Sequence, residues 1–381
     1  MTKSRRQFLR IAGSTAIIAA AGSAGFALTR TPTKALAPWQ MAGDDYADPR
    51  LRALSYAILA PNPHNKQPWL VTLEGEDRFS LGYDMDRLLP HTDPFNRQIV
   101  IGLGCFLELM CMAAAENGYR AEVSLFPEGE PVPVLDGRPI ARVTLVKDAS
   151  VQASPLFKQV LARRSNKEVF DVSRAVDPAD LTAVTSVVGQ DISVGSVSDP
   201  VAIERLRDLT WRAHMVEVQV PRTYMESVDV MRLGKSEIEA NPDGIDLGGP
   251  FLEAMNLAGV LTRPQLADMT SSAYKQGLEM YRGIMMSAMG YVFLSTQTNT
   301  RINQIAAGRN WVRVNLKAAE RGISIHPLSQ ALQEYVEMKA LVAELHDMLG
   351  QSGLRMQMFA RVGYGPAVAT SPRWPIDAKL I

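Results

Sequence analysis

The chain has 381 residues, with 40 lysines and arginines balanced by 40 aspartates and glutamates. The charges are unevenly distributed, because residues 1–37 hold six basic residues and no acid. Residues 38–381 therefore carry 34 basic and 40 acidic side chains, a net charge of −6. A body with this charge lacks the excess of cations that binding to a nucleic-acid backbone requires, so nucleic acid is excluded as an expected partner.

The N-terminus has the layout of an export signal. Arg5 and Arg6 precede an uncharged run, residues 11–28, and the small-residue sequence Ala-Leu-Ala follows at 35–37. This order is typical of a secretory signal peptide, and the paired arginines indicate the twin-arginine export machinery. We expect residues 1–37 to be this signal and the protein to be periplasmic. The alternative is an uncleaved anchor, which would be the chain's only membrane contact. Because the machinery exports folded proteins, the signal favours a cofactor inserted before export.

The rest of the chain alternates between helical and strand-like patterns. We predict helices at 48–59, 98–117, 154–164, 178–187, 200–219, 302–321 and 331–349, and strands at 68–74, 121–126, 140–146, 192–197 and 357–363. Residues 231–250 are rich in Gly, Asp and Pro and are expected to form an irregular loop. The Met-rich stretch 265–296 is predicted to be either a core helix or a mobile cover.

The two cysteines are not expected to form a disulfide. Cys105 and Cys111 are six positions apart in one predicted helix. At the helical rise per residue their Cα atoms would be about 9 Å apart, which exceeds the reach of a disulfide. Both are therefore predicted to be small core residues. The sequence also has no Cys/His spacing typical of a metal site.

An internal repeat organises the chain. Arg97, Gly104 and an Ala-Ala-Glu-x-Gly sequence ending at Gly118 recur at a constant offset of 204 positions, as Arg301, Gly308 and the same sequence ending at Gly322. Each copy predicts an apolar helix with a C-terminal glycine cap, followed by a strand, at 119–126 and at 323–328. We interpret the repeat as two tandem α+β units, 38–150 and 151–381, with the seam near 148–155.

The segment that ends in Asn65-Lys66-Gln67-Pro68-Trp69 resembles a motif of the nitroreductase family, whose members bind FMN. In that family the loop passes beside the flavin ring. The resemblance implies that Pro63, His64, Asn65 and Gln67 bind the cofactor here, with the two amides facing the pyrimidine edge of the ring. A polar loop stiffened by proline is the alternative interpretation.

Three further segments resemble other parts of the same family. Arg163, Arg164, Ser165 and Lys167, with Phe170 after them, match its phosphate-binding segment, and guanidinium groups suit phosphate because they bind it bidentately. Arg373 matches the basic loop at the end of the family's fold. The sequence Pro327-Leu328-Ser329 falls where the family places a loop against the reactive edge of the ring, although the family's acidic residue after the proline is absent.

These matches complement one another across the repeat. The Asn-x-Gln-Pro-Trp loop occurs only in the first unit, and the other three segments occur only in the second. The chain therefore resembles the double-length, Acg-like branch of the family, in which a nitroreductase-like fold of two tandem units forms a pseudo-dimer around one composite FMN site. This resemblance implies an oxidoreductase that reduces a small nitro, quinone or similar unsaturated acceptor. A protein that stores FMN without turnover is the alternative, and no catalytic residue is assigned.

Overall fold

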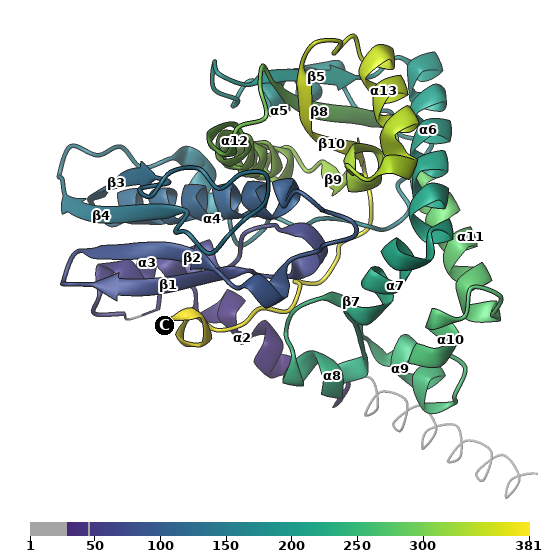
Figure 1. The fold of residues 1–381 in the computed structure, drawn as a ribbon, viewed down its shortest axis with the longest axis horizontal. Coiled ribbons are helices and arrows are strands. Elements are labelled where there is room, and N and C mark those ends of the chain that lie inside the picture. Colours follow the sequence, from purple (N-terminus) through teal and green to yellow (C-terminus); the bar gives the residue numbers. More distant parts are fainter. Residues whose placement is uncertain (1–28, 45) are drawn as a thin grey trace, which may run out of the picture.

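The computed structural model describes residues 29–44 and 46–381, and Figure 1 shows their arrangement. The predicted twin-arginine pair and most of the predicted signal lie outside the described residues. A first antiparallel sheet has the strand order β1-β2-β4-β3. Its strands are β1 Trp69–Glu74, β2 Arg78–Tyr83, β3 Tyr119–Leu125 and β4 Ala141–Lys147. Helices α3 Pro49–Ala57 and α4 Arg97–Glu116 accompany this sheet.

A second antiparallel sheet has the order β5-β8-β10-β9. Its strands are β5 Ser193–Val197, β8 Gly290–Thr296, β9 Ser324–Pro327 and β10 Arg355–Gly363. The helices around it are α5 Pro178–Thr185, α6 Pro200–Gln219, α12 Arg301–Glu320 and α13 Lys339–Met348. All seven residues of β8 are buried because apolar clusters cover both faces of this sheet. The architecture is thus mixed α and β, as the sequence predicted.

The helices α4 and α12 cross at the centre of the molecule, and glycines allow the close approach (Figure 1). A Cβ atom placed on Gly104 would lie 2.3 Å from the carbonyl oxygen of Ile305, and one on Gly308 would lie 2.0 Å from that of Ile101. Both pairs are related by the same 204-residue offset. The crossing is therefore locally two-fold symmetric, and only glycine fits at its centre.

Two buried arginines at the beginnings of these helices reinforce the crossing. Arg97 donates to the carbonyl oxygens of Gln357 (2.7 Å) and Leu332 (2.9 Å). Arg301 donates in the opposite direction, to the carbonyl oxygens of Pro131 (2.9 Å) and Pro133 (2.8 Å). Each guanidinium thus ties its own helix to backbone that belongs with the other sheet. Such bonds satisfy buried carbonyl groups that would otherwise be costly.

Helix α4 is long and strongly apolar. Within the described part of the chain it is the one helix long and apolar enough to cross a membrane by length and composition. Most of its residues are buried, however, and they belong to the continuous apolar core that includes α12 and both sheets. Helix α4 is therefore the central core helix of this fold.

A helical segment joins β5 to β8 and packs to one side of both sheets (Figure 1). After α6 it contains α7 Pro221–Asp229, β6 Met231–Leu233, α8 Gly234–Ala240, β7 Ile245–Leu247, α9 Pro250–Leu257, α10 Arg263–Ala267 and α11 Ser272–Met286, with β6 and β7 pairing in parallel. The expectation of an irregular loop at 231–250 was therefore wrong. The Met-rich stretch is likewise not one helix, because its last residues form the central strand β8.

The described chain begins beside helices α8 and α9 and ends on the first sheet (Figure 1). Helix α2 Thr33–Met41 contains the Ala-Leu-Ala sequence where processing was predicted, and Ala35 is buried there. The C-terminal residues return from β10, and the Ile381 amide donates to the carbonyl oxygen of Val71 (2.9 Å). The remaining short elements are the 3-10 helices η1 Pro63–Asn65, η2 Met85–Arg87, η3 Pro155–Gln159, η4 Ser329–Leu332, η5 Val336–Met338 and η6 Ile376–Lys379.

The predicted helices near 48–59, 98–117, 178–187, 200–219 and 302–321 are confirmed, as are all five predicted strands. The helix predicted at 154–164 is only the 3-10 turn η3, and the one predicted at 331–349 begins at Lys339 as α13. Strands β2 and β8 were not predicted. Both cysteines are free, and burial raises the pKa of the Cys105 thiol to about 12.

Candidate functional site

The three arginines predicted to bind phosphate lie together just beyond the C-terminal end of α3. Arg163 donates from Nη2 to the carbonyl oxygen of Leu59 (3.1 Å), and Arg373 donates from Nη2 to the same oxygen (3.3 Å). Arg164 follows Arg163, and its Nη1 donates to the carbonyl oxygens of Leu161 and Arg163. The side chains therefore converge from two segments about 210 positions apart in the sequence.

The charge of this cluster is not neutralised within the described part of the chain. Arg163 is 3% exposed and Arg373 2% exposed, and neither they nor Arg164 forms an ion pair there. The Nε atom of each of the three has no hydrogen-bond partner. Burial lowers the pKa of Arg163 to about 10, and burial together with the neighbouring guanidiniums lowers that of Arg373 to about 9. Arg163 and Arg373 therefore stay charged at neutral pH. Buried cations without a counter-charge are costly, so the cluster fits an anion such as a phosphate.

The loop beside this cluster is strained. His64, Asn65 and Gln67 all have positive φ values, of 47°, 52° and 48°. Residues other than glycine rarely adopt this conformation, and where they do the surrounding structure must enforce it. Here the C-terminal segment does so, because Asn65 Nδ2 donates to the carbonyl oxygen of Pro372 (3.0 Å) and Asn65 Oδ1 accepts from Arg373. The loop and the arginine cluster are thus directly connected.

The side chain of Gln67 bonds other parts of the chain at both of its ends. Its side chain is fully buried, and both of its ends are occupied within the chain. Nε2 donates to the carbonyl oxygen of Pro242 (2.7 Å), and Oε1 accepts from the amide of Trp374 (2.9 Å). Gln67 therefore fastens the C-terminal segment and the helical segment to the loop. The amide of Asn65 is occupied in the same way, so neither side chain is free to bond a ring edge in this conformation.

His64, in the predicted ring-side loop, lies near Lys167, in the predicted phosphate-binding segment. His64 Nδ1 is buried and has no partner. Burial first, and then the charges of Lys167 and Lys66, lower the pKa of His64 to about 4. The pKa of Lys167 is also lowered by the surrounding protein, although its side chain keeps solvent-accessible surface. At neutral pH an uncharged imidazole therefore lies near the amine of Lys167, and the two come from opposite sides of the repeat.

The segment 163–167 is held against β9. The amide of Asn166 donates to the carbonyl oxygen of Ile325 (2.9 Å), and its side chain donates to Ser324 Oγ (3.0 Å). Ser165, between Asn166 and Arg164, is half-buried. This pairing places the phosphate-binding candidates beside the strand that leads to Pro327.

The predicted ring-side turn, Pro327-Leu328-Ser329, is only partly available to a ligand. Leu328 is 1% exposed, packs in the second sheet's core, and donates its amide to the carbonyl oxygen of Phe359 (2.9 Å). Pro327 ends β9 and is paired with β10, whereas Ser329 begins η4. Core packing therefore occupies the side chain of Leu328, and the bond to Phe359 occupies its amide, whereas the predicted contact with a cofactor stays a prediction.

Sequence reasoning missed several residues around the site. Arg361 in β10 is fully buried, and its Nε donates to His326 Nδ1 (3.0 Å). This bond fixes His326 as the neutral tautomer that carries its proton on Nε2. His214 stacks on Tyr281, with ring centroids 4.6 Å apart. Asp243 accepts from Trp374 Nε1 (2.8 Å). His326, Arg361 and Trp374 lie within segments that resemble the family, but sequence reasoning assigned them no role, and only the fold reveals their contacts.

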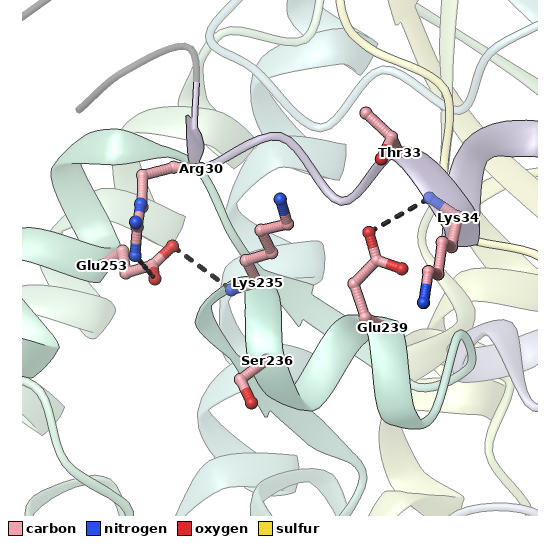
Figure 2. A pocket seen from close by; sticks show the side chains of 7 residues that line it. All are labelled: Arg30, Thr33, Lys34, Lys235, Ser236, Glu239 and Glu253. Carbon is pink, nitrogen blue, oxygen red and sulfur yellow. Dashed lines mark hydrogen bonds and ion pairs between the residues drawn. The ribbon is translucent and has the colours of Figure 1, made fainter. Parts of the chain in front are cut away.

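A separate cavity of about 480 Å³ lies between the start of α2 and helix α8 (Figure 2). Its lining residues are Arg30, Thr33, Lys34, Lys235, Ser236, Glu239 and Glu253. The charges there are largely matched, since Arg30 pairs with Glu253 (3.0 Å) and the Lys34 amide donates to Glu239 (3.1 Å). This cavity therefore differs from the arginine cluster, whose charges have no acidic partner in the described chain. Among the described residues there is also no group of three or more His, Cys, Asp or Glu arranged to hold a metal ion.

Two proteins of Mycobacterium tuberculosis are similar to this chain over most of its length. The protein named "Putative NAD(P)H nitroreductase acg" is 25% identical over 343 residues, which cover 85% of this chain and 93% of that protein. A second protein, named in the same terms, is 24% identical over 320 residues, covering 82% and 84% of the two chains. No family model matches the chain.

Solved structures of nitroreductases also resemble the fold. The FMN-dependent nitroreductase NfnB from Mycobacterium smegmatis, solved in complex with NADPH, aligns with a TM-score of 0.37 and 17% identity, covering 58% of this chain and 94% of its own. A nitroreductase with bound FMN from Desulfitobacterium hafniense aligns with a TM-score of 0.35 and 14% identity, covering 60% and 98%.

Proposed function

We propose that this chain, a homologue of the Acg-like proteins of the nitroreductase family, binds one FMN and is an FMN-dependent oxidoreductase that reduces a nitro, quinone or similar unsaturated acceptor. The observation that carries the proposal is the unneutralised cluster of buried Arg163 and Arg373 with half-buried Arg164. Guanidinium N–H groups bind the oxygens of a phosphate monoester, and the Nε atom of each of these three arginines has no partner in the described chain. FMN has such a group, and riboflavin does not.

The residues of this chain would bind and orient the cofactor. FMN, when bound, supplies two-electron transfer to an acceptor. The arginines would hold its phosphate, and Lys167 would place a positive charge near the flavin. His64 stays uncharged above about pH 4, so its free Nδ1 can accept a hydrogen bond without adding a second charge. The strained loop at 64–67, held by the C-terminal segment, keeps this wall of the site rigid.

The two predicted units, 38–150 and 151–381, would then share this single site as a pseudo-dimer. The local two-fold symmetry of the α4–α12 crossing supports this arrangement, as does the reciprocal bonding of Arg97 and Arg301. Within the site the first unit contributes His64 and Asn65, and the second contributes the arginines. We further propose the twin-arginine route and a periplasmic location, which the Arg5-Arg6 sequence supports. We place the end of the signal before Thr33 instead of at residue 37, because Ala35 is buried and its carbonyl oxygen accepts from the amide of Arg373.

A reoxidation experiment tests whether the bound flavin turns over. We expect purified protein loaded with FMN and reduced anaerobically with dithionite to be reoxidised within seconds by p-benzoquinone or a nitroaromatic compound, because the cofactor transfers electrons to an acceptor that reaches it. Stopped-flow absorbance of the flavin measures the rate. Free reduced FMN under the same conditions is the control. Flavin that stays reduced for many minutes would contradict turnover and support FMN storage.

A further inference from the structure

Helix α2 packs directly on the arginine cluster, although it precedes every segment that resembles the family. Trp39 is 6% exposed, and its Nε1 donates to the carbonyl oxygen of Ser371 (2.8 Å). The carbonyl oxygen of Ala35, one turn earlier, accepts from the backbone amide of Arg373 (2.8 Å). Two hydrogen bonds thus join α2 to the C-terminal segment on either side of Pro372, which Asn65 also contacts.

The indole ring of Trp39 also lies against two of the three guanidiniums. The Arg164 Cζ atom is 4.9 Å from the ring centroid, and the Arg373 Cζ atom is 5.6 Å from it. A guanidinium over an aromatic face is attracted by the ring quadrupole, and the attraction grows when both groups are buried. In a cluster that has no carboxylate partner among the described residues, this ring is the group that compensates part of the repulsion between the arginines.

An aromatic partner has an advantage over a carboxylate at this position. A carboxylate would form an ion pair with the guanidiniums and would compete with an incoming anion. The ring face instead fixes the guanidinium planes without adding a competing anion. The Nε atoms of Arg164 and Arg373 have no partner, whereas the Nη atoms of Arg373 already donate to oxygens of the chain. Fixed guanidinium planes lower the entropy lost when a phosphate binds.

We propose that Trp39 is a positioning residue that holds Arg164 and Arg373 ready for a phosphate monoester, so that helix α2 is part of the binding site. The proposal rests on the proposed function, since FMN is the phosphate ligand. It assigns to Trp39 a role in recognising the phosphate and none in recognising the ring. The effect of losing Trp39 should therefore appear with FMN and be absent with riboflavin.

The test compares FMN and riboflavin affinities of full-length variants, measured by quenching of flavin fluorescence. We expect Trp39→Leu to weaken FMN binding by about tenfold or more, in line with the loss of two cation–π contacts, and to leave riboflavin binding unchanged. Trp39→Phe retains a ring face and should stay within about threefold of wild type. Gln40→Ala, an exposed position on the same helix, is the matched control and should bind like wild type.

The outcomes separate this proposal from the proposed function. Wild-type protein that binds neither flavin overturns the proposed function and this proposal together. If wild type binds FMN, a Trp39→Leu variant with unchanged FMN affinity overturns only the positioning role. A Trp39→Leu variant that loses FMN and riboflavin equally also overturns it, because that pattern indicates general loosening. Trp39→Phe answers the same question if Trp39→Leu does not fold, and loss of FMN binding by Trp39→Phe to the level of Arg164→Ala would reject the role of the ring face.

Discussion

Replacing Arg164 and Arg373 together with alanine should lower the affinity for FMN by about 10²- to 10⁴-fold, since each charge-assisted hydrogen bond contributes about 1.5–3 kcal/mol. Both guanidiniums belong to the cluster that has unpartnered Nε atoms and no neutralising acid in the described chain. Riboflavin affinity should change little, because it lacks the phosphate. Isothermal titration with the two flavins measures the difference.

Arg174→Ala is the matched control for this double variant. Arg174 also stacks on an aromatic ring, with its Cζ atom 3.4 Å from the centroid of Tyr364, but it is exposed and lies outside the cluster. Its loss should leave FMN affinity within a factor of two of wild type. A double variant that remained fully loaded with FMN through purification would remove the phosphate assignment.

Gly308→Ala should destabilise the fold by about 3 kcal/mol or more, at the upper end of overpacking effects. The added Cβ would lie 2.0 Å from a backbone oxygen of α4 and 2.9 Å from the Cα atom of Gly104. Backbone atoms cannot rotate away as a side chain can, so the two helices must separate. The free energy of unfolding from urea denaturation measures the cost.

Gly277→Ala is the control that isolates the helix crossing. Gly277 lies inside α11, and a Cβ there would meet nothing within 4 Å. Alanine has the better helix propensity, so this variant should gain up to about 1 kcal/mol of stability. Equal midpoints for Gly308→Ala and wild type would mean that α4 and α12 do not approach as closely as the structure has them.

The long helices could be predicted because their signals are local. Helix α6 begins where Asp199 caps it, with Oδ2 accepting from the Ala202 amide (2.8 Å), and Pro200 occupies its first position. Strand β8 gave no such signal. It is buried on both faces, so its residues do not alternate, and a continuous apolar run next to a Met-rich helix looks like more helix.

The candidate site could also be predicted only in part from the sequence. Arg163, Arg164 and Arg373 could be nominated from residue type and order, and the structure brings them together. The occupied amide of Gln67 could not be predicted, because its partners are 175 and 307 positions away. A motif indicates which donors and acceptors are present, and long-range packing decides which of them the chain uses itself. Trp39 was missed for the same reason.

The number of FMN molecules bound per chain tests most directly whether both units build one shared site. Full-length protein should be titrated with FMN, and the flavin absorbance of the separated complex compared with the protein concentration from amino-acid analysis. One composite site requires one FMN per chain, because the arginine cluster and the strained loop each occur once in the described chain. Two FMN molecules per chain, or colourless protein that takes up none, would contradict a single site shared between the units.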